Sequence, residues 1–245
     1  GKLVDIQADA SHLQEREVKG TKTNELMTKF RQSILNDTPP QEKKHAEDFI
    51  KANTKSVVSL YLIRKYFFAN SSPDYDKALS LLALLEKEQG KNPLFGKMKT
   101  WATDTRNSSV GKQLPTFTAY DLNGKMVSSA DLSSAPVAVI YTWASYNYDS
   151  QELQRELKRR QKKANGRLKL MGFCLDASKY ECKQNIKRDS ITSPTICNGE
   201  MMEDKTLNKL GLKSLPNIIL LQNGKIIARG MKKQELYNKL DELLK

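Results

Sequence analysis

Apolar side chains in the first hundred residues recur every three or four positions, which is the spacing of one face of an α-helix. Pro, Gly, Asn and Ser residues, which interrupt helices, separate these stretches from one another. After a short extended piece at 3–6, the predicted helices cover residues 23–35, 40–50, 57–67, 72–90 and 93–106. This pattern predicts a small antiparallel helical array over residues 1–106, with its leucine and aromatic stripes forming the core.

The pattern changes after a linker at residues 107–110, which lies within a stretch rich in Ser, Asn and Gly at 105–111. Two continuous apolar runs, 136–143 and 167–175, read as buried strands because they are short and rich in β-branched and aromatic residues. Helices are predicted between and after them, at 149–164, 182–187, 205–210 and 233–244. The dipeptide Asn223-Gly224 separates two further strands and predicts a hairpin turn. The order indicates an α/β domain over residues 111–245, with a parallel strand pair extended by an antiparallel hairpin.

Composition narrows the classes of partner. The net charge is +13, from 41 Lys and Arg against 28 Asp and Glu, and such a field attracts anions and nucleic acid. However, the basic residues are spread along the chain and alternate with acidic ones, and no aromatic residues are interleaved with them to stack on bases. We therefore expect no specific nucleic-acid partner. No apolar run reaches the roughly 18 residues that a membrane-spanning helix needs.

The chain has only three cysteines and two histidines. The gaps between Cys174, Cys182 and Cys197 fit neither a zinc nor a haem motif, and His12 and His45 lie far apart, so we expect no metal and no cofactor. Cys174 lies inside a predicted strand and should be a small buried hydrophobe. Cys182 and Cys197 could approach each other and form a disulfide, which the sequence alone leaves open.

Several motifs in the second half resemble the exported bacterial thioredoxin-like proteins of TlpA and ResA type, which are related to AhpC/TSA proteins. The matching segments are 111–117 (GKQLPTF), 121–125 (DLNGK), 143–146 (WASY), 214–217 (SLPN) and 223–228 (NGKIIA). The resemblance implies a thioredoxin-like fold, with a central mixed sheet flanked by helices, and a cis-proline loop at Pro216. It also implies export to the periplasm or outer cell envelope of a bacterium.

The amino-terminal half resembles the all-helical insert of secreted relatives, whose small β domain would precede residue 1. The resemblance also allows attachment to a membrane through an N-terminal lipid anchor upstream of the sequence.

Members of this family exchange disulfides through a Cys-x-x-Cys pair at the start of the first helix, where the helix dipole stabilises the thiolate. Here Asn147 and Ser150 stand at the two cysteine positions. Neither can form a thiolate or a disulfide, so the resemblance predicts a redox-inactive binding or scaffolding module. A plainer interpretation is that the segment only caps the helix.

The family also binds extended peptides beside the cis-proline, and the matching residues here form a predicted groove. These are Trp143, Tyr146, Asn147, Tyr148, Leu215 and Pro216. We expect an unidentified protein or peptide partner there. The alternative function is a thiol-disulfide oxidoreductase that uses Cys182 and Cys197. A peroxidase would need a cysteine near Thr142, and Ser150 has no accompanying hydrolase motif.

Overall fold

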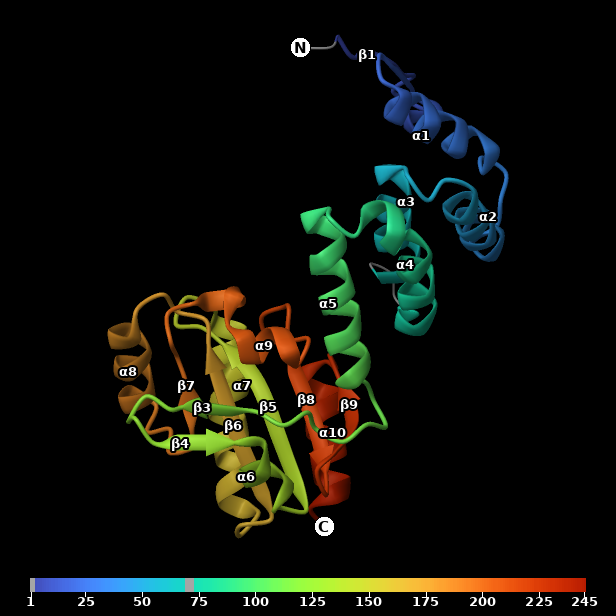
Figure 1. The fold of residues 1–245 in the computed structure, drawn as a ribbon. Helices are drawn as coiled ribbons and strands as arrows, with labels where there is room; N and C mark the ends of the chain where they lie inside the picture. The colour runs from blue at the N-terminus through green and yellow to red at the C-terminus, as the bar shows by residue number, and fades with distance from the viewer. Residues whose placement is uncertain (1–2, 69–72) are drawn as a thin grey trace. The chain divides into compact units, whose positions relative to one another are not determined.

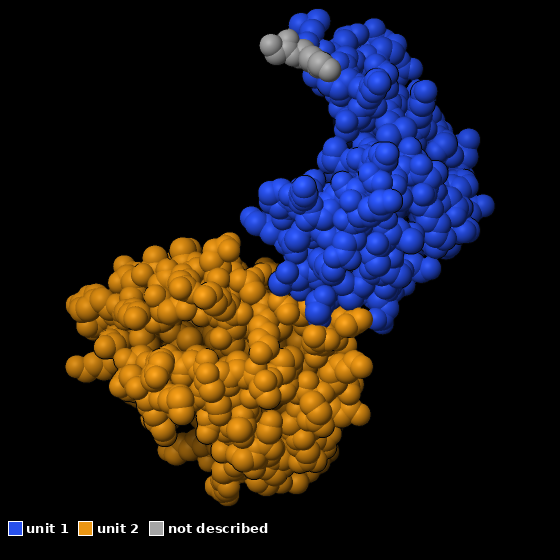
Figure 2. Space-filling view, viewed as in Figure 1, with its two compact units in different colours: residues 1–103 blue, residues 104–245 orange. Residues whose placement is uncertain are grey.

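The computed structural model describes residues 3–68 and 73–245; the predicted helix start at Ser72 lies outside these residues. The chain divides into two compact units, residues 1–103 and 104–245, coloured separately in Figure 2. The division falls inside helix α5 (Pro93–Asn107), a few residues before the predicted linker at 107–110. Ser108 is fully buried, so the segment after α5 is anchored in the second unit. No helix among the described residues is long and apolar enough to cross a membrane.

The N-terminal unit is a helical array preceded by a two-stranded hairpin (Figure 1). Its elements are β1 (Asp5–Gln7), β2 (Glu17–Lys19), α1 (Lys22–Ser33), α2 (Pro39–Ala52), α3 (Val57–Ile63), a π-helical turn η2 (Arg64–Phe68), α4 (Tyr75–Gln89) and the first part of α5. Thr21 and Asp74 cap α1 and α4 by accepting hydrogen bonds from backbone N–H groups. The apolar stripes form the core, in which Ile50 and Leu85 are fully buried, as predicted.

The C-terminal unit contains a five-stranded sheet in the order β7-β6-β5-β8-β9. Its strands are β5 (Val137–Trp143), β6 (Leu168–Cys174), β7 (Thr195–Ile196), β8 (Ile218–Gln222) and β9 (Lys225–Arg229). Strands β5, β6 and β7 are parallel, whereas β8 and β9 are antiparallel to their neighbours. A separate hairpin of β3 (Thr118–Tyr120) and β4 (Met126–Ser128) precedes them. The predicted parallel pair with an antiparallel hairpin extension is therefore confirmed.

Helices cover both faces of this sheet, as Figure 1 shows. Helices α7 (Tyr148–Lys163), α8 (Lys179–Arg188) and α10 (Lys233–Leu243) contribute to one apolar layer, and α6 (Ser129–Ser133) and α9 (Lys205–Lys209) contribute to the other. Alternate residues of a strand point to opposite faces. Accordingly, Tyr141 and Trp143 belong to the layer under α7, while Ile140 belongs to the opposite layer.

Helix α8 and strand β7 are two of the elements that differ from the sequence-based expectation. Helix α8 begins at Lys179, three residues before the predicted start, because Ser178 accepts a hydrogen bond from the N–H of Glu181 and caps it. The short strand β7 (Thr195–Ile196) forms in a stretch where no strand was predicted, because β6 offers it a parallel partner. Pairing with a distant strand is a tertiary effect that two residues of local pattern cannot signal.

The hairpin turn between β8 and β9 places Asn223 at φ 49° and Gly224 at φ 76°, as the Asn-Gly signal predicts. We expect Gly224→Ala to lower the free energy of unfolding by about 2 kcal/mol, because positive φ costs about 1 kcal/mol for alanine and the added Cβ would lie 2.9 Å from Ser133 Oγ. Urea unfolding of the full chain measures this. Gly124→Ala is the matched control, because its φ is +78° but nothing lies within 4 Å of the added Cβ. Equal costs for the two variants would contradict the contact argument.

Candidate functional site

Asn147 and Ser150, which stand at the two cysteine positions of the family pattern, stabilise the start of α7 by hydrogen bonds. Asn147 is the N-cap, and its Oδ1 accepts a hydrogen bond from the Ser150 N–H at 2.8 Å. Ser150 is fully buried. Its Oγ donates to the Asn147 carbonyl at 2.9 Å and accepts from the Ala144 N–H at 3.1 Å. Both polar side chains are thus engaged in holding the turn from β5 into α7, as the capping interpretation predicts.

The Leu215–Pro216 peptide bond is cis, and its loop lies at the same end of β5 as the start of α7. The Thr142 side chain fixes this loop: its Oγ1 donates to the Ser214 carbonyl at 2.9 Å and accepts from the Asn217 N–H at 2.7 Å. The N–H and C=O of Leu215 take part in no hydrogen bond with any described residue. This leaves one free backbone donor and one acceptor beside the start of α7.

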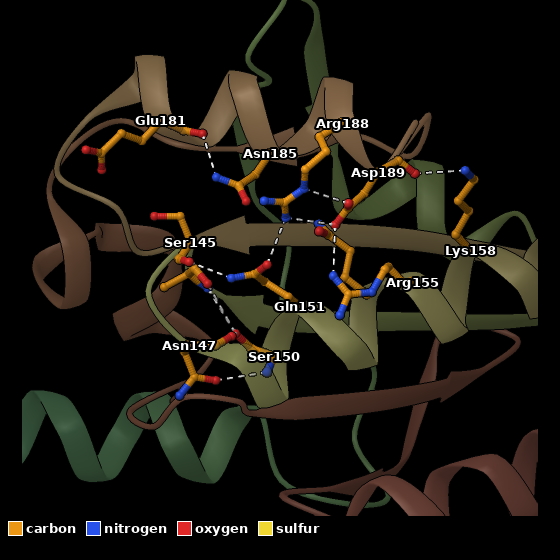
Figure 3. Close-up of polar contacts among 12 residues, drawn as sticks. Ser145, Asn147, Ser150, Gln151, Arg155, Lys158, Glu181, Asn185, Arg188 and Asp189 are labelled. Carbon is orange, nitrogen blue, oxygen red and sulfur yellow. Dashed lines mark hydrogen bonds and ion pairs between the residues drawn. The ribbon is translucent and has the colours of Figure 1, made fainter.

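A polar network joins α7 to α8 next to this corner (Figure 3). The Gln151 Nε2 donates to the Ser145 carbonyl, and its Oε1 accepts from Arg188 at 2.9 Å. Asp189, at the end of α8, accepts hydrogen bonds from the guanidinium of Arg155 at 3.2 Å and, through its carbonyl, from Lys158 at 2.8 Å. The network therefore fixes α8 against α7 at several points.

The three cysteines converge on one buried cluster in the layer that α7 and α8 cover. Cys174 is the last residue of β6, Cys182 lies in α8, and Cys197 follows β7 directly. Their sulfur atoms all lie within 4.8 Å of one another. All three are free thiols, and their exposed fractions are 5%, 0% and 5%. The expected burial of Cys174 and approach of Cys182 to Cys197 are both observed, but the threefold cluster was not foreseen.

The three thiols perturb one another strongly. Hydrogen bonds from the Cys174 and Cys182 thiols to the Cys197 sulfur lower the pKa of Cys197. Hydrogen bonding with Cys182, and then with Cys197, raises the pKa of Cys174, and burial acts in the same direction. A negative charge on the Cys197 sulfur would thus be stabilised by hydrogen bonds from two S–H donors. The Cys197 Sγ also lies 3.6 Å from the Asp176 carbonyl oxygen, to which it donates as a thiol.

Asp176 connects this cluster to the start of α7. Its side chain is 1% exposed, and its Oδ1 accepts a hydrogen bond from the Ser145 N–H at 2.8 Å. The other carboxylate oxygen, Oδ2, is buried without a hydrogen-bond partner among the described residues. The corner of the sheet therefore holds an unpaired carboxylate oxygen, three thiols and the capped end of α7.

No family model matches this chain, and no curated protein sequence matches it. Solved structures do. The C-terminal domain of a protein assigned as a thiol-disulfide oxidoreductase from Bacteroides thetaiotaomicron matches with a TM-score of 0.50 and 26% identity, over 56% of this chain and 97% of that one. A thioredoxin-like protein from Bacteroides caccae matches over 87% of each chain, with a TM-score of 0.57 and 12% identity. The C-terminal unit has the thioredoxin-like fold.

Within the thioredoxin-like unit, one predicted groove residue is wrongly placed. Trp143, the last residue of β5, points to the face of the sheet that α7 covers, and it is fully buried there. It therefore cannot line a surface groove. Tyr146 and Tyr148 are 66% and 73% exposed. Leu215 and Pro216 are half-buried. The remaining groove residues are therefore accessible at the corner where the α7 start and the proline loop meet.

Sequence reasoning missed two residues that organise this corner, Thr142 and Asp176. Thr142 was considered only as a companion to a peroxidatic cysteine, although a threonine inside an apolar strand signals a buried hydroxyl that needs a partner. Asp176 follows a buried strand directly, and a carboxylate in that place is rarely buried without a role. Both signals were present in the sequence, but neither tells which backbone group the side chain contacts.

Proposed function

We propose that the thioredoxin-like unit is a redox-inactive binding module derived from TlpA/ResA-type thiol-disulfide oxidoreductases. The observation that carries this proposal is the use of Asn147 and Ser150 as a hydrogen-bonded helix cap at the two positions where exchange chemistry needs sulfur. A solved relative of this unit bears the name of thiol-disulfide oxidoreductase. The family's location leads us to propose export to the bacterial periplasm or outer envelope, with lipid attachment as a further proposal.

The proposed ligand is an extended segment of another protein, bound at the corner beside Leu215. Its free N–H and C=O can pair with the backbone of an extended chain, which is the main source of affinity when a strand is added to an edge. Tyr146 and Tyr148 flank the start of α7 with large exposed rings, and exposed tyrosines are frequent energetic centres of protein interfaces. These groups can recognise a peptide without any covalent step.

A cysteine-blocked unfolded polypeptide, such as carboxymethylated ribonuclease, tests this proposal because it cannot form a mixed disulfide. We expect amide shifts centred on Leu215 and a dissociation constant that rises about tenfold in the double variant Tyr146→Ala plus Tyr148→Ala. Tyr180→Ala is the matched control, since Tyr180 is 70% exposed but lies on α8. Equal weakening by the control, or shifts that avoid Leu215, would contradict a site at this corner.

A second candidate function is disulfide exchange through Cys182 and Cys197. The proximity of their sulfur atoms, within 4.8 Å, favours it. Their burial opposes it, because an attacking thiolate must reach a substrate disulfide in solution. This candidate requires turnover that depends on both cysteines.

A further inference from the structure

The chain has three cysteines in 245 residues, and three separate elements bring all of them to one point. Cys174 ends β6, Cys182 comes from α8, and Cys197 follows β7. They are separated by seven and fourteen residues in the sequence, which matches no metal-binding motif. The fold, rather than a local loop, assembles the cluster, so the absence of a motif does not argue against a site.

The sulfur triangle has the right size for one metal ion. Three points that all lie within 4.8 Å of one another fit inside a circle whose radius is 4.8 Å divided by √3, or about 2.8 Å. A metal–thiolate bond is about 2.3 Å long. Each sulfur therefore needs to move inward by no more than about 0.5 Å, which is within the reach of small side-chain rotations.

The donor set selects the kind of ion. Sulfur ligands favour soft ions, above all Cu(I) and Zn(II). A structural zinc site closes with four protein ligands, whereas among residues 3–68 and 73–245 no fourth Cys, His, Asp or Glu has a ligand atom within 4.8 Å of all three sulfurs. The two histidines, His12 and His45, belong to the other unit. Three sulfurs without a fourth protein ligand suit Cu(I), which does not require tetrahedral coordination.

The scaffold around the cluster is rigid and largely closed to water. Cys182 is fully buried and belongs to the helix that Gln151, Arg155 and Lys158 tie to α7. Cys174 lies on a strand paired on both sides. Cys174 and Cys197 each keep 5% of their surface exposed, so the cluster is not completely sealed from solvent. Metal sites need ligands held in place by such surrounding contacts.

We infer that Cys174, Cys182 and Cys197 form a binding site for one soft metal ion, Cu(I), held by three sulfur atoms in the thioredoxin-like unit. The site adjoins the proposed peptide corner through Asp176, but it uses different residues and does not depend on peptide binding. Binding replaces the thiol protons by bonds to the ion and involves no change in the oxidation state of the sulfur or the copper.

Anaerobic titration of the reduced full chain with Cu(I), against a chromophoric Cu(I) chelator, tests the inference. We expect one ion per chain and an X-ray absorption spectrum with three sulfur neighbours at about 2.3 Å. Cys174→Ala, Cys182→Ala and Cys197→Ala should each weaken binding by at least about a hundredfold. Tyr180→Ala is the control on the same helix and should leave the affinity unchanged.

The X-ray absorption spectrum of the native chain tests the copper site even where a cysteine variant fails to fold, because it counts the sulfur ligands without any substitution. Failure of the reduced native chain to compete with the chelator would overturn the inference. Binding that persists in all three variants, oxygen or nitrogen neighbours in the spectrum, or tight binding of Zn(II) but not Cu(I) would also overturn it.

Discussion

The double variant Asn147→Cys plus Ser150→Cys should acquire thiol-disulfide exchange. Asn147 is the N-cap of α7 and Ser150 occupies its first turn, so a thiolate at 147 would face the helix dipole and free N–H groups. Such an environment lowers a cysteine pKa from about 8.5 toward 7 or below. The thiolate fraction at pH 7 then rises, and we expect reduction of a disulfide substrate about tenfold faster than by an unstructured Cys-x-x-Cys peptide.

The single variants separate the two roles of the introduced pair. Asn147→Cys alone should attack a disulfide but accumulate as a mixed disulfide, because no second thiol releases it. Ser150→Cys alone should react slowly, since position 150 is buried. A folded double variant whose thiols react no faster than the peptide would show that residues 147 and 150 do not occupy the family's redox positions.

Arg229→Ala should lower the free energy of unfolding by about 2–4 kcal/mol. The Arg229 guanidinium donates to the Ser108 carbonyl and hydroxyl, and to the carbonyls of Leu210 and Gly211 at 2.9 and 3.0 Å. Ser108 and Leu210 are fully buried. Removing the guanidinium leaves acceptors in the interior without their charged donor, and each such loss costs about 1–3 kcal/mol. Urea unfolding of the full chain measures the effect.

Two variants serve as controls for this prediction. Arg229→Lys keeps the charge but presents a single ammonium in place of a fork of donors, so it should recover only part of the lost stability. Arg159→Ala removes an arginine whose side chain is 55% exposed and pairs with Glu156, and it should cost less than about 1 kcal/mol. An Arg229→Ala variant as stable as Arg159→Ala would refute the anchoring role of Arg229.

The sequence pattern predicted the parts of the fold that depend on local chemistry. Continuous apolar runs marked β5 and β6, and Asn223-Gly224 marked the hairpin turn. Each of these elements carries its own signal within ten residues. The capping role of Asn147 and Ser150 was foreseen for the same reason, since a cap is a contact between neighbours in sequence.

The contacts that the sequence could not show join residues far apart in the chain. The cysteine cluster depends on β6, α8 and β7 meeting at one corner. The spacing motifs used to recognise metal sites cover only ligands that lie close together in the sequence, so they could not predict it. The burial of Trp143 follows from which side of the sheet the last residue of β5 faces. That side is set by strand register, and a shift by one residue would reverse it.

The most direct test of the central claim is the reduction of insulin disulfides by the native chain, with dithiothreitol as the electron source. With Asn147 and Ser150 in place of sulfur, and with Cys174, Cys182 and Cys197 buried, the reaction should proceed no faster than with dithiothreitol alone. Catalysed turnover that disappears in Cys182→Ser or Cys197→Ser would contradict the claim and establish an oxidoreductase that uses the buried cysteines.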